Sequence, residues 1–305
     1  MEFLYFLEDI RMPWLDTLML SVTQLGDEVA FLVVALIVFW CVDKRRGYYL
    51  LSVGFMGTVI SQFMKLAFQV PRPWVQDPGF TILEAAREGA GGYSFPSGHS
   101  QCAVGTFGSI AYTTKNVWVR RVCVAIMVLV PFSRMYIGVH TPADVLVGAG
   151  ISLALIFLLH PAVFRERGRW IKWLIVLMLV LAADYLLFVE FWPFPAEIDP
   201  MNLASGRKNA YTLLGCTLGV VIVYQADRRW LNFPTQAKWW AQIIKAVLGL
   251  GLVLLVKEGL KGPLDAVFPG VFSRALRYFL VVLTAGVLWP MTFRFFAKTA
   301  ESETK

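Results

Sequence analysis

The sequence predicts an all-α, polytopic membrane protein with about nine transmembrane helices. Of its 305 residues, 57% are hydrophobic and 16% are charged, whereas a soluble domain has roughly 45–50% apolar and about 25% charged residues. The apolar residues are gathered in long runs, and short basic segments separate these runs. This alternation is typical of helical membrane proteins.

Nine apolar runs follow one another along the chain. Each is a candidate for a membrane-spanning helix, which needs about 20 residues. The first run is short, so we expect its helix to begin a turn or more before Asp27. The runs cover residues 29–42, 49–69, 99–114, 121–139, 143–160, 171–189, 210–225, 239–256 and 276–292.

Residues 1–26 precede the first run and mix apolar with acidic positions. Leu4, Leu7 and Ile10 recur at helical spacing, which predicts a short amphipathic helix lying at a membrane interface. Pro13 interrupts the pattern, and we expect a second short helix after it. The first residues lack a basic region and a small-residue cleavage site, so we do not expect a removable signal peptide.

The basic residues are distributed unequally between the two sides of the predicted membrane. If the first run passes from outside to inside, the inner segments are 43–48, 115–121, 161–172, 227–238 and 293–305. These segments hold 16 of the 28 Lys and Arg residues, whereas the outer segments hold nine. Because basic residues favour the cytoplasmic side, this predicts an external N-terminus and a cytoplasmic C-terminus. The same distribution explains the net charge of +7 without a nucleic-acid partner.

Three polar clusters interrupt the apolar sequence between residues 65 and 144. In the predicted topology each cluster lies at the outward end of a membrane-spanning helix, so all three share one depth on the non-cytoplasmic side. We therefore expect them to form a single site that binds phosphate. The clusters are Lys65 with Arg72-Pro73, Pro96-Ser97-Gly98-His99, and Ser133-Arg134 with His140 and Asp144.

The first cluster brings cations into the membrane. Lys65 and Arg72 are seven residues apart and share one helical face. A charge at mid-membrane costs roughly 2.5–3.5 kcal/mol, so Lys65, Arg72 and Arg134 would together cost on the order of 8–10 kcal/mol if they faced lipid. A pocket filled by an anion suits them better, because an arginine fork matches phosphate geometry. The alternative is that Lys65 extends toward the interface and Arg72 lies among lipid headgroups.

The second cluster begins a long apolar helix. The free N–H groups and the positive dipole end of such a helix bind phosphate readily. Gly98 lets the backbone approach a ligand, Ser97 can cap the helix or bind a phosphate oxygen, and His99 can donate a proton to a leaving oxygen. The alternative is an ordinary helix cap beside an interfacial histidine.

The third cluster has the most specific spacing. Thr141 suits the N-cap of the next helix and Pro142 suits its first turn. Asp144 then lies close enough to reach back to His140, and a carboxylate on one ring nitrogen leaves the other nitrogen free to attack. The alternative is that Asp144 only caps its own helix.

Other residues with reactive side chains give weaker signals. His160 lies at the opposite end of its helix, so we expect a structural role for it. Glu190, Glu197 and Asp199 could bind a metal, but the prolines among them favour a solvated loop. Lys245 lies within an apolar run without an explanation. Four cysteines without CxxC spacing are expected to be free buried thiols, namely Cys41, Cys102, Cys123 and Cys216.

Together the three clusters resemble the signature of the type 2 phosphatidic acid phosphatase (PAP2) superfamily. That signature has three motifs. The first is a Lys separated by six residues from Arg-Pro, and the second is Pro-Ser-Gly-His. The third is a Ser-Arg separated by five residues from a His, which is separated by three residues from an Asp. The resemblance covers about residues 50–160, and the additional helices give a layout similar to that of glucose-6-phosphatases. The matching residues, without departure, are Lys65, Arg72, Pro73, Pro96, Ser97, Gly98, His99, Ser133, Arg134, His140 and Asp144.

The resemblance implies an acid phosphatase mechanism that needs no metal or other cofactor. His140 would attack phosphorus and form a phosphohistidine, with Asp144 orienting its ring, while His99 would protonate the leaving group and then activate water. The remaining residues would hold the phosphoryl oxygens through positioning and charge. These substrate-binding residues are Lys65, Arg72, Ser97, Gly98 and Arg134.

The apolar pattern together with the resemblance, which covers only about residues 50–160, predicts three parts of the chain. Residues 1–26 would be interfacial amphipathic helices, and residues 27–160 a PAP2-like catalytic helical core. Residues 161–305 would be additional transmembrane helices, for which a second bundle, a wall of the substrate site and a surface for a homodimer are alternatives.

The expected function is hydrolysis of lipid phosphate monoesters or diphosphates at the outer face of a plasma membrane, such as a bacterial inner membrane. A phosphotransferase using the same site, an enzyme for soluble phosphate esters and a non-enzymatic transporter or scaffold are the alternatives. Related haloperoxidases are soluble, which argues against that activity. The expected partners are a lipid phosphate and the bilayer. We expect the loop 74–95 to cover the pocket and to select the substrate.

Overall fold

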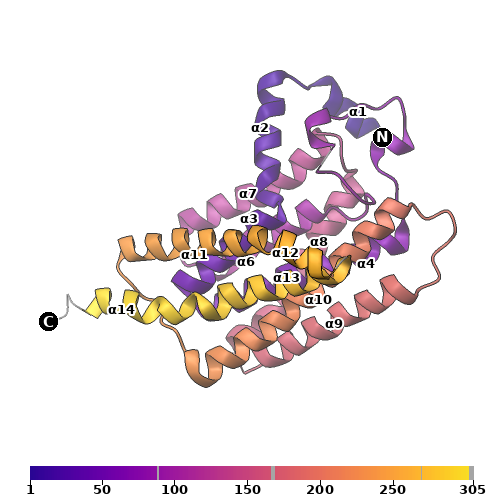
Figure 1. Ribbon diagram of the computed structural model, residues 1–305. Coiled ribbons are helices and arrows are strands. Elements are labelled where there is room, and N and C mark those ends of the chain that lie inside the picture. The colour runs from indigo at the N-terminus through magenta and orange to yellow at the C-terminus, as the bar shows by residue number, and fades with distance from the viewer. Residues whose placement is uncertain (88, 166–168, 269, 302–305) are drawn as a thin grey trace. The chain divides into compact units, whose positions relative to one another are not determined.

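The computed structural model describes residues 1–87, 89–165, 169–268 and 270–301, with the side chains of 298–301 left aside. The described residues form helices and no strand (Figure 1), which confirms the predicted all-α class. The chain divides into two compact units. Unit 1 holds residues 1–32, 50–161 and 193–206, and unit 2 holds residues 33–49, 162–192 and 207–305.

Among the described residues, six helices are long and apolar enough to cross a membrane, or seven if the bent pair Pro13–Gly26 and Glu28–Val42 is counted as one span. The predicted count of about nine is therefore not supported. The helix Gly98–Thr113 has only 16 residues, and the helix Val117–Tyr136 carries three arginines. Hydropathy runs mark both segments as helices, but length and charge keep them from meeting the criteria for a span.

Unit 1 is built mainly from α1 to α8. Its helices are α1 (Glu2–Asp9), α2 (Pro13–Thr23), η1 (Gln24–Gly26), α4 (Lys44–Phe68), α5 (Pro73–Gln76), η3 (Glu84–Ala86), α6 (Gly98–Thr113), α7 (Val117–Tyr136) and α8 (Pro142–Phe164). The helix α3 (Glu28–Ile37) and the first residues of α4 extend into unit 2.

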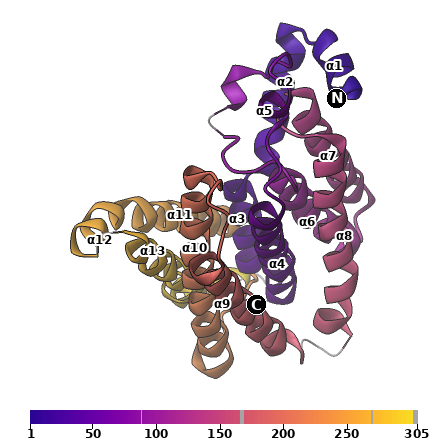
Figure 2. The same cartoon turned by 90° about the vertical axis from the view of Figure 1, so that its right-hand side faces the viewer.

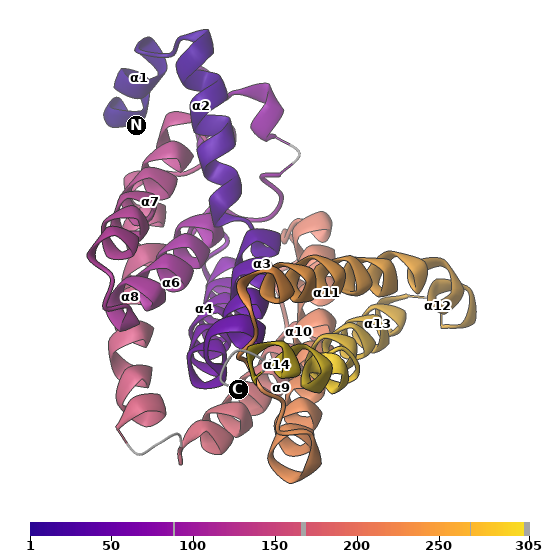
Figure 3. The ribbon, with the colours of Figure 1, turned by 90° about the vertical axis from the view of Figure 1, so that its left-hand side faces the viewer.

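The centre of unit 1 is the packing of α6 and α2 against α7 (Figure 3). Ala103 and Phe107 of α6 are buried against Cys123 and Val130 of α7. Asn116 caps α7, because its side chain accepts hydrogen bonds from the N–H groups of the helix's first turn. This packing holds the C-terminal end of α7 in place, where the third polar cluster begins.

The N-terminal helix α1 is amphipathic, as the spacing predicts. Leu4 and Leu7 are buried, and Leu4 packs against Phe80 and Ile82 of the following loop. Phe6 on the opposite face is 58% exposed. The position of this face at a membrane interface stays a prediction.

Unit 2 contains the later helices. These are η2 (Val38–Val42), α9 (Ile171–Phe191), α10 (Pro200–Ala226, from its third turn), η4 (Asp227–Leu231), α11 (Trp239–Gly259), α12 (Lys261–Val267), α13 (Val271–Leu283), η5 (Thr284–Leu288), η6 (Pro290–Thr292) and α14 (Phe293–Glu301). The segments η2, η4 and η5 are π-helical. Helices α11 and α13 form a hairpin through α12 and pack on each other (Figure 2).

Lys245 has a structural explanation within unit 2. Its side chain is fully buried, its Nζ donates a hydrogen bond to the carbonyl of Thr235 at 3.0 Å, and it lies 4.3 Å from the ring centroid of Phe293. A carbonyl and an aromatic face together compensate a buried cation. Lys245 therefore fixes the start of α11 rather than lining a site.

The other weak signals also have structural partners. The ring of His160 packs edge-on against Tyr112 at 4.7 Å between centroids. Glu190 pairs with Arg207 at 2.9 Å, and Asp199 caps α10 by accepting from the Met201 N–H at 2.7 Å. Within the described residues no group of three or more His, Cys, Asp or Glu side chains is placed to hold a metal. All four cysteines are free, two of them buried and two partly buried.

Candidate active site

A cavity of about 280 Å³ lies in unit 1 and brings the three polar clusters together. Its walls come from α4, the segment before α5, the N-terminal end of α6, the C-terminal end of α7 and the loop before α8. Two of the eight predicted site residues, Ser97 and Asp144, lie outside the lining. The six that line it are Lys65, Arg72, Gly98, His99, Arg134 and His140.

Three cations are buried around this cavity, with exposures of 9% for Lys65, 7% for Arg72 and 3% for Arg134. Such burial argues against the alternative in which Lys65 and Arg72 extend to the interface. Arg134 donates to the Thr23 hydroxyl at 2.9 Å, and its Nε has no hydrogen-bond partner among the described residues. This buried N–H group is available to an anion in the cavity.

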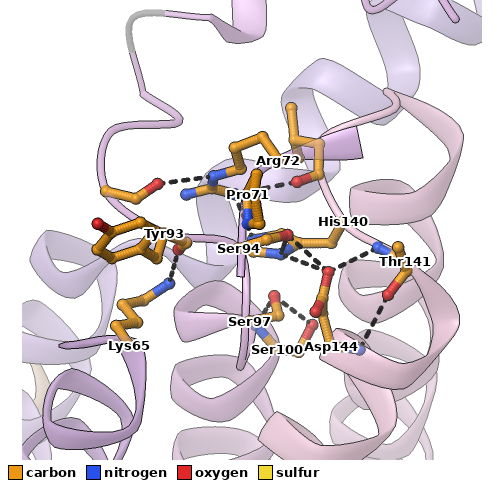
Figure 4. A network of polar contacts seen from close by, with 12 residues as sticks. Lys65, Pro71, Arg72, Tyr93, Ser94, Ser97, Ser100, His140, Thr141 and Asp144 are labelled. Carbon is orange, nitrogen blue, oxygen red and sulfur yellow. Dashed lines mark hydrogen bonds and ion pairs between the residues drawn. The ribbon is translucent and has the colours of Figure 1, made fainter. Parts of the chain in front are cut away.

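Carbonyl groups of the loop before α6 accept hydrogen bonds from the first cluster (Figure 4). Lys65 Nζ donates to the Tyr93 carbonyl at 2.6 Å. Arg72 donates through Nε to the Gly92 carbonyl at 3.0 Å and through Nη2 to the Gly91 carbonyl at 2.8 Å. Neutral carbonyls orient these cations without neutralising them, so their charge remains available to a phosphate.

The contact between Arg72 and His140 defines the tautomer of the imidazole. Arg72 Nη1 lies 2.9 Å from His140 Nε2 (Figure 4). A guanidinium can only donate, so Nε2 accepts and the ring proton is placed on Nδ1. The Nε2 electron pair thus accepts a hydrogen bond from Arg72 within a cationic cavity, and a group that displaced Arg72 would meet it there.

The Nδ1 side of His140 faces Asp144 and Ser94. Asp144 Oδ2 lies 3.5 Å from Nδ1 and accepts a hydrogen bond from the Ser94 hydroxyl at 2.6 Å. The Ser94 oxygen is itself 3.4 Å from Nδ1. Asp144 also accepts from the Thr141 N–H at 2.8 Å. The carboxylate therefore both caps α8 and supports the imidazole, so the two interpretations of Asp144 are compatible.

The environment of His140 favours its neutral form. Burial, followed by the positive charges of Arg72 and Arg134, lowers the pKa of His140 well below its usual range. A lowered pKa means that the ring stays unprotonated as the pH falls through about 6.5, the ordinary value for histidine. The neutral form of the ring is therefore favoured at neutral and mildly acidic pH.

The N-terminal end of α6 supplies the second cluster. Ser97 is the N-cap, and its buried hydroxyl accepts hydrogen bonds from the Ser100 N–H and Ser100 hydroxyl. A Cβ on Gly98 would meet no atom within 4 Å, which leaves space in front of the helix end. His99 lines the cavity, and a Cβ on Gly26 would lie 2.8 Å from the His99 carbonyl. A glycine at 26 is therefore needed where η1 meets α6.

Part of the predicted covering loop reaches the cavity. Gly89 and Gly91 line it, and Glu88 lies outside the described residues. Arg87 pairs with Glu84 at 2.7 Å and lies over the Trp74 ring at 5.5 Å. These contacts fold the loop back on itself, so its carbonyls rather than its charged side chains face the site.

Sequence reasoning missed several polar residues at or beside the site, among them Thr23, Asp27, Ser61 and Ser94. Thr23 holds Arg134, and Ser94 joins Asp144 to His140. Asp27 and Ser61 line the cavity, and the buried Ser61 hydroxyl has no partner among the described residues. Ser94 could have been noticed as a polar residue two positions before Pro96. Ser61 precedes Lys65 by one helical turn and could also have been noticed, whereas Thr23 and Asp27 lie far from the motifs in sequence and carry no local signal.

The comparisons with known proteins agree with this site. The sequence model of the PAP2 superfamily matches residues 45–168, which include the eight predicted site residues. A second model, described as the PAP2 superfamily phosphatase transmembrane extension, matches residues 211–302. The two family models and the candidate membrane spans place the chain in a class of integral membrane phosphatases. The chain belongs to the PAP2 superfamily.

Three curated relatives show the range of the family. Phosphatidylglycerophosphatase B of Bacillus subtilis (strain 168) is 32% identical over 49% of this chain and 75% of its own length. Sphingosine-1-phosphate phosphatase 1 of Mus musculus is 23% identical over 78% of this chain and 58% of its own length. Glucose-6-phosphatase 3 of Bos taurus is 24% identical over 92% of this chain and 88% of its own length. No solved structure matches the chain significantly. The family and these names are consistent with a phosphoric ester hydrolase.

Proposed function

We propose that the protein hydrolyses lipid phosphate monoesters or diphosphates through a phosphohistidine on His140, at the non-cytoplasmic face of a plasma membrane. The observation that carries this proposal is the unprotonated Nε2 of His140, which accepts from Arg72 in a cavity with three buried cations. A nucleophile beside preorganised positive charge is what phosphoryl transfer requires.

In the first step the electron pair on His140 Nε2 attacks phosphorus. A P–N bond forms and the bond from phosphorus to the ester oxygen breaks. His99 enters this step as the imidazolium, gives one proton to the departing oxygen and becomes neutral. Asp144 and Ser94 stabilise the imidazolium through Nδ1. The phosphoryl oxygens take over the donors of Arg72, Arg134 and Lys65, together with the N–H groups at the start of α6.

In the second step water replaces the histidine. The neutral His99 accepts a proton from water, the resulting hydroxyl attacks phosphorus, and the P–N bond breaks. Inorganic phosphate leaves and His140 regains its free Nε2. Each bond and proton is balanced by side chains of this chain and by water.

The lipid character of the substrate and the membrane face rest on further observations. Two relatives are named for phosphates of lipids, and α1 exposes large apolar side chains that suit an interface. The basic residues concentrate in segments on the other side of the predicted membrane. A homodimer stays a prediction.

Phosphate release from purified protein in detergent with EDTA present tests the proposal. We expect release from a panel of phosphatidic acid, phosphatidylglycerophosphate, sphingoid phosphate and prenyl diphosphate, and a loss of at least about a thousandfold in His140→Ala. His160→Ala is the matched control and should retain activity. Brief incubation with a ³²P-labelled substrate should leave an acid-labile label on the protein. Release that survives in His140→Ala would exclude this nucleophile.

A second candidate is hydrolysis of a soluble phosphate ester. The match to a glucose-6-phosphatase over 92% of this chain supports it. Sugar phosphates assayed without added lipid distinguish it from the first. A phosphotransferase would use the same residues, and it would be recognised by a phosphorylated acceptor in place of inorganic phosphate.

A further inference from the structure

Unit 2 contains two adjoining hollows that have no part in the site of unit 1. The first, the basic pocket, has a volume of about 670 Å³ and is lined by Lys44, Arg45, Arg228, Arg229 and Arg294 among others. The second, the apolar groove, has a volume of about 510 Å³ and lies between α10, α11 and α13. Arg229 and Trp230 line both hollows, so the two form one continuous surface.

A π-helical turn builds the basic pocket. The segment η4 (Asp227–Leu231) follows α10, and Asn232 ends it with a left-handed backbone at φ +32°. A π-turn is wider than an α-turn and is frequent at functional sites. Here it directs Arg228, Arg229 and Trp230 toward the pocket.

The positive charge of the pocket is not compensated internally. Lys44 pairs with Asp227 at 2.7 Å, and Asp227 is the one acid among the described lining residues. Arg294 donates only to carbonyls, those of Trp230 at 3.4 Å and Leu231 at 3.3 Å. Four arginine charges therefore remain around about 670 Å³. Such guanidinium groups suit the oxygens of a phosphate.

A buried hydroxyl in the same pocket also lacks a partner. Tyr48 is 5% exposed and lines the pocket, and its Oη makes no hydrogen bond to any described residue. A buried hydroxyl without a partner is costly. An oxygen of a bound anion would accept a hydrogen bond from the Tyr48 hydroxyl.

The apolar groove continues from this pocket. Its lining includes Ile222 of α10, Val256 of α11, Leu280 and Leu283 of α13, and Leu288 of η5. A free phosphate would leave this surface uncovered, whereas a hydrocarbon chain would fill it. Charge in one hollow and apolar side chains in the next together match an amphiphile whose polar end is anionic.

We propose that the basic pocket and the apolar groove bind one anionic phospholipid, with its phosphate among the arginines and an acyl chain in the groove. Basic pockets between membrane helices on the cytoplasmic side bind such headgroups, and the basic segments 43–48, 227–238 and 293–305 are those that the charge distribution places there. The ligand is a bound lipid and not a substrate, because every lining residue lies in unit 2 and none of them lines the cavity that contains His140. The proposal does not depend on the phosphatase mechanism.

Native mass spectrometry of the purified full-length protein tests the site, with phosphatidylglycerol as probe and phosphatidylcholine as the neutral comparison. We expect one retained phosphatidylglycerol, and binding about fivefold weaker for each arginine removed, hence about 25-fold in Arg228→Gln/Arg229→Gln. Lys208→Gln, on the same helix but outside the pocket, should bind as the wild type does. Equal retention in the double variant and the wild type would overturn the proposal.

Two further arms separate the headgroup from the chain. Inorganic phosphate should displace phosphatidylglycerol only at a far higher concentration than phosphatidylglycerol itself needs to bind. Leu283→Trp should weaken the binding of phosphatidylglycerol and leave the binding of inorganic phosphate to the basic pocket unchanged. If phosphatidylglycerol binds no better than inorganic phosphate, the groove has no role and the lipid assignment is wrong. If the double variant does not fold, Arg45→Gln, at an exposed position outside the π-turn, provides the same comparison.

Discussion

His140 is held from two sides by groups of different chemistry. Arg72 donates to Nε2 at 2.9 Å, whereas Ser94 and Asp144 lie on the Nδ1 side at 3.4 and 3.5 Å. In the proposed mechanism, the Arg72 contact with Nε2 is replaced by the phosphoryl group when substrate binds. The contacts of Ser94 and Asp144 on the Nδ1 side persist through the reaction. Ser94 is thus a positioning residue, because it acts on the nucleophile through the imidazole proton.

Replacing Ser94 with alanine should lower kcat about ten- to a hundredfold with little change in KM. The hydroxyl that joins Asp144 to Nδ1 would be lost, so the imidazolium formed in the first step would be less well stabilised, while the cations that bind phosphate would remain. Steady-state kinetics on the best substrate of the panel, with the pH profile of kcat, measure this. Ser94→Thr should restore part of the rate.

Ser109→Ala is the control for this change. Ser109 is also fully buried, and its hydroxyl has no hydrogen-bond partner among the described residues, so its removal should leave kcat unchanged. A kcat for Ser94→Ala equal to that of Ser109→Ala would show that Asp144 orients His140 without the serine.

At the scale of elements, the loop between α5 and α6 orients the side chains of Lys65 and Arg72 in the cavity. Its carbonyls at residues 91–93 accept from Lys65 and Arg72, and the Ser94 N–H donates to the Val70 carbonyl at 2.8 Å. Gly92 has φ +77°, a left-handed conformation that side chains disfavour. The loop can therefore place its carbonyls toward Arg72 only with glycine at this position.

Gly92→Ala should destabilise the protein by about 1–2 kcal/mol and lower its thermal midpoint by a few degrees. The strain arises at the residue whose carbonyl accepts from Arg72 Nε, so the activity should fall as well. Thermal unfolding in detergent and phosphate release measure the two effects. Gly91→Ala is the matched control for stability, because an added Cβ there meets no atom within 4 Å and the residue is not left-handed. An unchanged midpoint in Gly92→Ala would contradict this account of the loop.

The spacing of the motifs was sufficient to predict most of the candidate site, but not the elements around it. Lys65, Arg72 and His140 meet through short loops. The shared helical face predicted for Lys65 and Arg72 is not formed, because α4 ends at Phe68 and Arg72 is extended before α5. Thr23 and Asp27 reach the same cavity only through the packing of α2 and η1 against α6 and α7, which no local pattern encodes. Helices were predictable at all nine apolar runs, yet hydropathy could not tell spans from the short α6 or the arginine-bearing α7.

At the scale of the whole molecule, the phosphatase motifs and the lipid pocket belong to different compact units. The two matching family models divide the chain in a similar way, at residues 45–168 and 211–302. The sequence could predict the first from its motifs, whereas the second carries no polar signature beyond Lys245 and the basic segments. The predicted boundaries at 26 and 160 stay predictions.

The membrane orientation predicts on which side of the membrane loops of each unit lie, and single cysteines can test this prediction. If the candidate site opens to the non-cytoplasmic side, the exposed Glu84 lies outside and the exposed Gln236 lies in the cytoplasm. In a background without the four native cysteines, a membrane-impermeant maleimide applied to intact cells should label Glu84→Cys and leave Gln236→Cys unlabelled. Permeabilised cells should label both, which controls for reactivity. Labelling of Gln236→Cys alone in intact cells would reverse the orientation, and with it the face at which substrate is hydrolysed.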